Sequence, residues 1–100
     1  MGRELTNRRA FVEQQLFDVQ LRLERARVAL EVAEFHVGAL REDASAAEAR
    51  RHAAETPLAD RACAAVRERL AAMAESAARA REVVLDLERT KDGLLDKLVG

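Results

Sequence analysis

Hydrophobic residues recur along this chain mostly at alternating intervals of four and three, over residues 5–47 and again over residues 66–98. An average interval of 3.5 residues keeps apolar side chains on one face of a helix that packs against another helix. We refer to these positions as the seam. In the first segment they are Leu5, Val12, Leu16, Val19, Leu23, Ala26, Leu30, Ala33, Val37, Leu40, Ala44 and Ala47, and in the second Val66, Leu70, Met73, Ala77, Ala80, Val84, Leu87, Leu94 and Leu98.

The two segments are separated by a strong helix-start signal. Thr56 is a good N-cap, and Pro57 suits the first position of a helix. The residue before a proline resists the α conformation, so a preceding helix should end there. The sequence therefore predicts one all-α domain with a helix over about residues 4–54, a turn at 55–57 and a second helix over about residues 57–99.

The two halves of the seam match when the numbers of facing residues sum to about 110. Leu23 then faces Leu87, and Leu30 faces Ala80, a large side chain opposite a small one as close packing requires. This register predicts an antiparallel coiled-coil hairpin. It also places Arg27 near Arg81 on one flank, which is unfavourable.

A slip of one heptad is the alternative, because it would pair Glu34 with Arg67. That slip needs a longer, non-helical connection between about residues 44 and 57. Residues 46–55 are strong helix formers and make a poor loop. Flanking charge pairs contribute only tenths of a kcal/mol each, so a continuous first helix is favoured.

A second apolar stripe lies on the first helix, roughly opposite the seam. A hairpin provides one intramolecular partner for this helix, so the stripe would be exposed in a monomer. Large exposed apolar patches mark contact sites. We expect a protein interface here, formed by a second hairpin in a four-helix bundle or by a helix of another protein. Its residues are Phe17, Leu21, Val28, Val32, Phe35 and Ala39.

Composition and charge limit the partners and the location that we expect for this protein. Positive and negative residues are interleaved with a net charge of −1, which disfavours nucleic acid as a partner. No apolar run approaches the ~18 residues that cross a bilayer, so we expect no membrane association. The single cysteine, Cys63, cannot form an internal disulfide. A reducing, cytoplasmic location is the expectation that follows.

Few side chains could carry chemistry. His52 follows Glu48 by four residues, but a metal site needs three or four ligands. His36 has no acidic residue one helical turn away, and the inward-facing Glu-Xaa-Xaa-His motif of di-metal bundles is absent. Cys63 continues the seam three residues before Val66, and a cysteine in such a position behaves as a small hydrophobe. We therefore expect no catalytic residues, no metal, no cofactor and no enzyme activity.

The function predicted from these observations is a non-enzymatic scaffold that acts through contacts between helix faces, most simply as a homodimer. The alternative is a small regulatory adaptor that sequesters a protein partner through the face around Phe17 and Phe35. Such an adaptor would be comparable to small anti-sigma coiled coils or to secreted Trp-Xaa-Gly hairpins. The motifs of neither family are present, and Phe35-His36-Val37-Gly38 lacks the tryptophan of the second.

Overall fold

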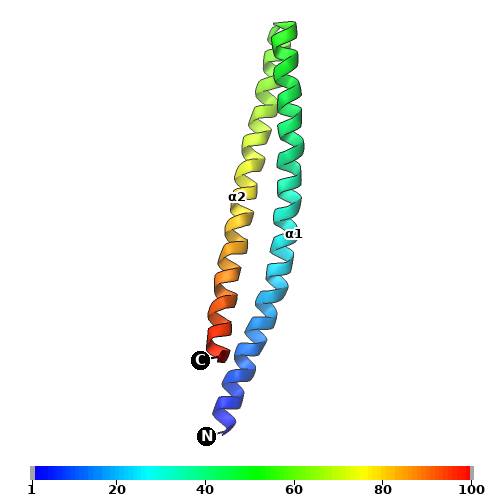
Figure 1. The fold of residues 1–100 in the computed structure, drawn as a ribbon. Coiled ribbons are helices and arrows are strands. Elements are labelled where there is room, and N and C mark those ends of the chain that lie inside the picture. Colours follow the sequence, from blue (N-terminus) through cyan, green and yellow to red (C-terminus); the bar gives the residue numbers. More distant parts are fainter. Residues whose placement is uncertain (1, 100) are drawn as a thin grey trace.

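The computed structural model describes residues 2–99, which form two long helices packed side by side. Helix α1 spans Gly2–Ala54 and helix α2 spans Pro57–Val99. The chain ascends along α1 and returns along α2, so the helices are antiparallel (Figure 1). The hairpin measures 78 × 15 × 14 Å. No strand is present in this part of the chain, as the all-α prediction requires.

The connection between the helices is short because each helix end satisfies its own backbone groups. Glu55 has a φ of 51°, in the left-handed region, and its N–H donates to the carbonyl of Arg51 at 3.0 Å. This bond closes α1 with a left-handed C-terminal cap. Thr56 then caps α2, because its Oγ1 accepts a hydrogen bond from the N–H of Ala59 at 3.2 Å. Helix α1 is unbroken through residues 44–54.

The left-handed conformation of Glu55 gives a direct stability prediction. A non-glycine residue in this region costs roughly 1–2 kcal/mol, and glycine avoids that strain. Glycine also loses more backbone entropy on folding, so part of the gain is offset. We expect Glu55→Gly to raise the free energy of unfolding by up to about 1 kcal/mol, measured by urea titration. A decrease would contradict the strain assigned to this cap.

The hydrophobic core is a single narrow row between the two helices. No polar or charged residue of the described chain is buried, and Leu23 and Cys63 are the most enclosed side chains, each 1% exposed. Two helices enclose only one face of each other, so the rest of each helix remains in solvent. The buried residues all belong to the seam or its continuation, and they are Val19, Leu23, Val37, Ala47, Cys63, Ala77, Val84 and Leu94.

Three ion pairs across the helices fix the register. They join Arg27 to Glu88, Glu34 to Arg81 and Glu48 to Arg67. In each pair the two residue numbers sum to 115, which is closer to the 110 of the favoured register than to the 101 of the slipped pair Glu34–Arg67. The slipped alternative would have placed Glu34 beside Arg67, and the structure does not contain that pair.

The expected repulsion between Arg27 and Arg81 is wrong. Side chains of a helix lean toward its N-terminus. Because the helices are antiparallel, Arg27 and Glu88 lean toward each other, whereas Arg27 and Arg81 lean apart. The guanidinium of Arg27 lies 3.5 Å from Glu88, and that of Arg81 lies 3.0 Å from Glu34. The flank therefore carries alternating attractive pairs instead of like charges.

Candidate functional site

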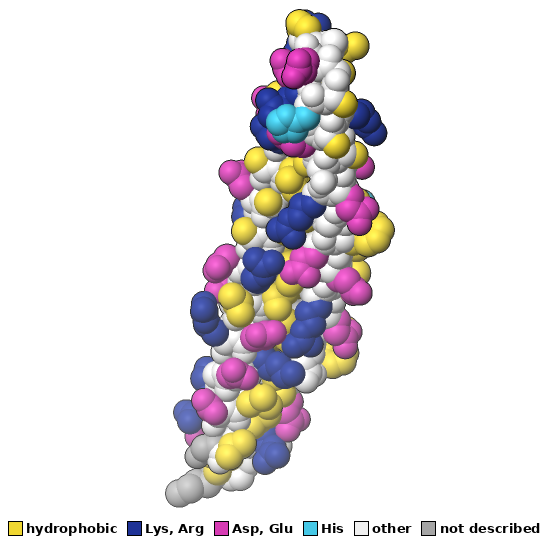
Figure 2. Space-filling model, turned by 45° about the horizontal axis from the view of Figure 1, so that its top comes forward, with side chains coloured by type: hydrophobic (Ala, Val, Ile, Leu, Met, Phe, Trp, Pro, Cys, Tyr) yellow, Lys and Arg dark blue, Asp and Glu magenta, His cyan; other side chains and the backbone are white. Residues whose placement is uncertain are grey.

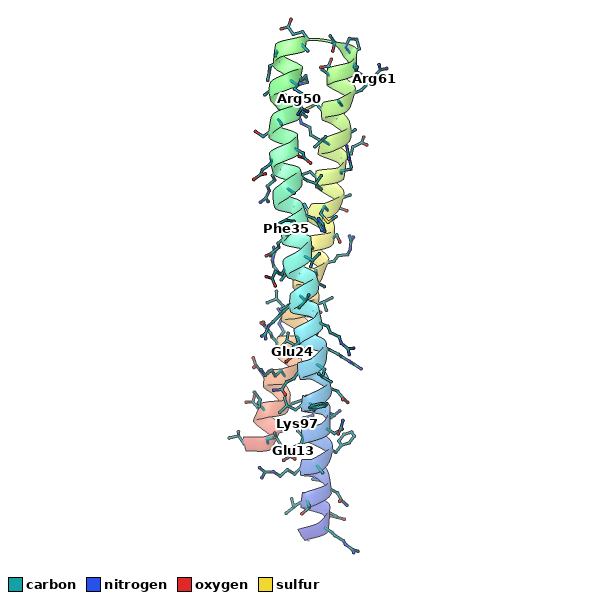
Figure 3. The ribbon with its side chains drawn as sticks, turned by 90° about the vertical axis from the view of Figure 1, so that its right-hand side faces the viewer. Glu13, Glu24, Phe35, Arg50, Arg61 and Lys97 are labelled. Carbon is teal, nitrogen blue, oxygen red and sulfur yellow. The ribbon has the colours of Figure 1, made fainter. Side chains whose placement is uncertain are left out.

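The clearest candidate site is the apolar stripe on α1 that faces away from α2. We call it the outer face. Phe17 is 57% exposed, Val28 59% and Phe35 74%, although each is strongly hydrophobic. Figure 3 views the molecule from the side on which α1 lies, and Phe35 is on the near helix. All six predicted interface residues are exposed, namely Phe17, Leu21, Val28, Val32, Phe35 and Ala39.

Helix α2 has no comparable face. In α1, Leu21, Val28 and Phe35 follow one another at intervals of seven residues on the side opposite the seam. The corresponding line on α2 is charged and exposed at every step, and its residues are Arg61, Glu68, Glu75, Glu82, Arg89 and Asp96. A solvated helix normally has one apolar face and one charged face. Helix α2 follows that rule and α1 departs from it, so the second apolar face is specific to α1.

Charges elsewhere are mixed in sign. Figure 2 shows Lys and Arg side chains interleaved with Asp and Glu along both helices on the face it presents.

The described part of the chain contains no group of three His, Cys, Asp or Glu residues that could hold a metal ion. His36 is exposed, and its ring lies at a steep angle to that of Phe35, with 5.9 Å between the ring centroids. The outer face is thus the feature of this surface that departs most from an ordinary solvated helix.

A polar cluster around Glu48 ties the two helices together near the connection. The Glu48 carboxylate accepts hydrogen bonds from Arg51 at 2.5 Å, from the Cys63 thiol at 3.2 Å and from Arg67. His52 Nε2 lies 3.1 Å from the same carboxylate. The spacing of Glu48 and His52 was visible in the sequence. The contacts with Cys63 and Arg67 were not, because they depend on how the helices are aligned.

The pKa shifts in the cluster around Glu48 favour a structural role for its side chains. The hydrogen bonds from Arg51 and from Cys63 lower the pKa of Glu48 to about 2, so this carboxylate is a poor general base near neutral pH. The hydrogen bond to Glu48, together with burial, raises the pKa of the Cys63 thiol. A nucleophilic cysteine needs the opposite shift and solvent access. Cys63 therefore acts as a packed side chain that donates one hydrogen bond.

The lowered pKa of Glu48 predicts how stability responds to acid. A carboxylate with a depressed pKa stabilises the fold fully above its ordinary pKa of 4.5, and this contribution disappears as the pH falls toward 2. Glu48→Gln should lower the melting temperature at pH 7, and the difference from wild type should shrink between pH 4.5 and 2. Thermal unfolding of both chains across this range measures it. A difference that stays constant would contradict the assigned role.

Helix α1 extends beyond the end of α2 at the open end of the hairpin (Figure 1). A groove lies at this end, between the two helices. It has a volume of about 750 Å³ and contains both apolar and cationic side chains. The seam pattern did not predict this groove. The signal that could have found it is Phe11, an aromatic next to a seam position. The groove is lined by Leu5, Thr6, Arg8, Arg9, Phe11, Val12, Lys97 and Leu98.

Comparison with known proteins does not assign this chain to a family. No protein-family model, curated protein or solved structure matches this chain. Neither helix contains, within residues 2–99, a segment long and apolar enough to cross a membrane. Function must therefore be inferred from the exposed surface of the hairpin.

Proposed function

We propose that this protein is a non-enzymatic interaction module that binds a protein partner through the outer face of α1. The observation that carries the proposal is the exposure of Phe17 and Phe35, at 57% and 74%, on a helical stripe opposite the seam. Isolated exposed apolar residues are common, but a contiguous patch of several hundred Å² marks an interaction site. The simplest partner is a second copy of the chain.

The size of the outer face is compatible with a homodimer. Its side chains offer on the order of 500 Å² per hairpin, given that a phenylalanine alone presents 150 Å² or more. Two copies would then bury about 1,000 Å², the lower bound for a specific protein interface. The hairpin core contains many alanines and is narrow, so this burial would also stabilise the fold.

The position of the outer face determines the form of such a dimer. It lies opposite the seam, so two hairpins that meet there place their helices in one row, with α2 on each edge and the two α1 helices in the middle. The four-helix assembly expected from the sequence would accordingly be a flat layer of four helices and not a square bundle. In a square bundle each helix contacts two neighbours on adjacent sides, and the apolar stripe of α1 would not face the centre.

The concentration dependence of thermal unfolding tests the homodimer. If unfolding is coupled to dissociation, a hundredfold increase in protein concentration stabilises the folded state by up to about 2.7 kcal/mol. For a chain of this size we expect the melting temperature to rise by roughly 10 °C. A melting temperature independent of concentration, with a mass of one chain, would contradict the homodimer. The regulatory adaptor that captures a different protein through the same face would then be the remaining form of the proposal.

A further inference from the structure

The outer face is nearly symmetric about Val28. Phe17 and Ala39 each lie eleven residues from it, and Leu21 and Phe35 each lie seven residues from it. The apolar spacing is therefore almost the same when α1 is read from either end. Val32 is the one member without an apolar counterpart. In a two-fold antiparallel pair of helices each residue meets the one equally far beyond the axis, so such a pattern is self-complementary.

We propose that the occupant of the outer face is a second copy whose α1 runs antiparallel to the first, with the two-fold axis at Val28. The inference rests on the proposed function and adds the orientation and register of the dimer. Each copy then contributes the same patch to the contact, which is an isologous interface. The pairing closes on itself and covers the outer face of both copies.

Side-chain size supports the antiparallel arrangement. Phe17 of one copy would face Ala39 of the other, and Leu21 would face Phe35, so large residues meet small or medium ones. A parallel dimer would instead stack Phe17 on Phe17 and leave Ala39 opposite Ala39. Close-packed interfaces alternate large and small residues across facing positions, and mismatched layers create clashes or voids.

Gly38 fits the same arrangement. Glycine weakens a helix interior, and no atom lies within 4 Å of where its Cβ would be, so nothing inside the hairpin requires a glycine here. In the antiparallel dimer Phe17 of the second copy packs beside Gly38 and Ala39. The missing side chain would leave room for the phenylalanine ring.

Polar residues limit the patch at equal distances from the proposed axis. Gln14 and Glu42 continue the line of Leu21, Val28 and Phe35, and both are exposed. Each lies fourteen residues from Val28. The apolar contact therefore spans about 33 Å in the middle of α1, given the 1.5 Å rise of a helix. Along this line a polar residue closes the apolar row at each end, as a two-fold axis at Val28 requires. Phe11, which is 64% exposed, lies beyond Gln14 and has Ser45 as its counterpart, so it stands outside the symmetric contact.

Charged residues at the edge of the outer face favour a parallel dimer, but only weakly. The antiparallel register brings Glu24 near Glu31 of the second copy, whereas a parallel register brings Glu24 near Arg25. All three residues are exposed. Exposed charge pairs contribute much less than the burial of a phenylalanine, so the size of the apolar side chains determines the orientation.

One matched pair of variants tests the packing around Gly38. Gly38→Ala places a methyl group where Phe17 of the second copy would lie, and overpacking of this kind should raise the dimer dissociation constant roughly tenfold or more. Gly93→Ala, in α2, also meets no atom within 4 Å and serves as the control. Both changes should stabilise their helices equally. Equal dissociation constants in dilution calorimetry would contradict the proposed contact.

The orientation is tested by electron spin resonance distance measurement. A single nitroxide is attached at Gln14→Cys in a Cys63→Ala background, and a second sample carries it at Glu42→Cys. Circular dichroism first verifies that both remain helical. Each chain has one label, so every measured distance joins two copies. The antiparallel dimer predicts about 40 Å at both positions, from the helical rise.

The possible results separate the two proposals. Distances near 40 Å in both samples support the antiparallel dimer. Distances below about 20 Å in both would show a parallel dimer, and would overturn the orientation while leaving the outer face as the interface. No dipolar coupling, together with a light-scattering mass of one chain, would overturn the homodimer itself and with it this inference.

Discussion

A chain carrying Phe17→Ser and Phe35→Ser is expected to have the mass of a single hairpin at concentrations where the wild type is dimeric. Loss of a central interface aromatic commonly costs 2 kcal/mol or more, so two losses should weaken the dimer by about a thousandfold or more. Neither side chain is buried in the hairpin, so the single hairpin should remain helical. Light scattering gives the mass, and circular dichroism gives the helix content.

The matched control replaces two exposed apolar residues that lie outside the outer face. Leu58, near the connection, is 70% exposed, and Val83, on α2, is 50% exposed. Leu58→Ser and Val83→Ser remove comparable exposed hydrophobic residues and should leave the mass of the wild type unchanged. If both double variants dissociate alike, general loss of hydrophobicity would explain the result. If neither dissociates, the outer face is not the dimer contact.

Leu23→Ala should produce the largest loss of stability among substitutions in the seam. Leu23 is 1% exposed and is the largest side chain that is fully enclosed between the helices. Truncation of a buried leucine to alanine costs about 2–5 kcal/mol, because apolar contact is lost and a cavity remains. A narrow two-helix core has few other contacts to compensate. Urea unfolding should therefore show a much lower midpoint.

Val28→Ala is the counterpart of this change on the outer face. Val28 lies on the same helix and is 59% exposed, so its truncation should barely alter the unfolding of a single hairpin at low concentration. At high concentration the same change should weaken the dimer. Leu23→Ala with no more effect than Val28→Ala in dilute protein would contradict the placement of the core.

Much of the fold could be predicted from the sequence because two signals were strong. The interval of 3.5 residues identified the seam in both helices. Buried residues of the structure such as Leu23, Val37, Val84 and Leu94 are all seam positions. Thr56 and Pro57 marked the helix start that the structure has. Both signals are local or periodic, so they need no knowledge of how the chain packs.

The charge contacts could not be predicted in the same way. Arg27 was expected beside Arg81, yet it pairs with Glu88, because the tilt of side chains along antiparallel helices decides which flanking residue is reached. Glu48 illustrates the same limit. Its hydrogen bond with Cys63 joins residues fifteen positions apart, and only the register of the hairpin brings them together.

The outer face was predicted as a set of residues, but its occupant was not. Periodicity alone shows that Phe17, Val28 and Phe35 share a helix face, and the structure leaves that face uncovered by α2. What covers it depends on a second molecule. The near symmetry about Val28 is present in the sequence, but it acquires meaning only once the face is known to be exposed.

The absolute mass of the wild-type protein tests the central claim most directly. Light scattering is preferable to elution volume, because a hairpin of 78 × 15 × 14 Å elutes earlier than a compact protein of equal mass. Measured between about 10 and 500 µM, a range that covers moderate dimer affinities, the mass should reach twice 11.1 kDa. A mass of 11.1 kDa over the whole range would contradict the proposed dimer through the outer face of α1.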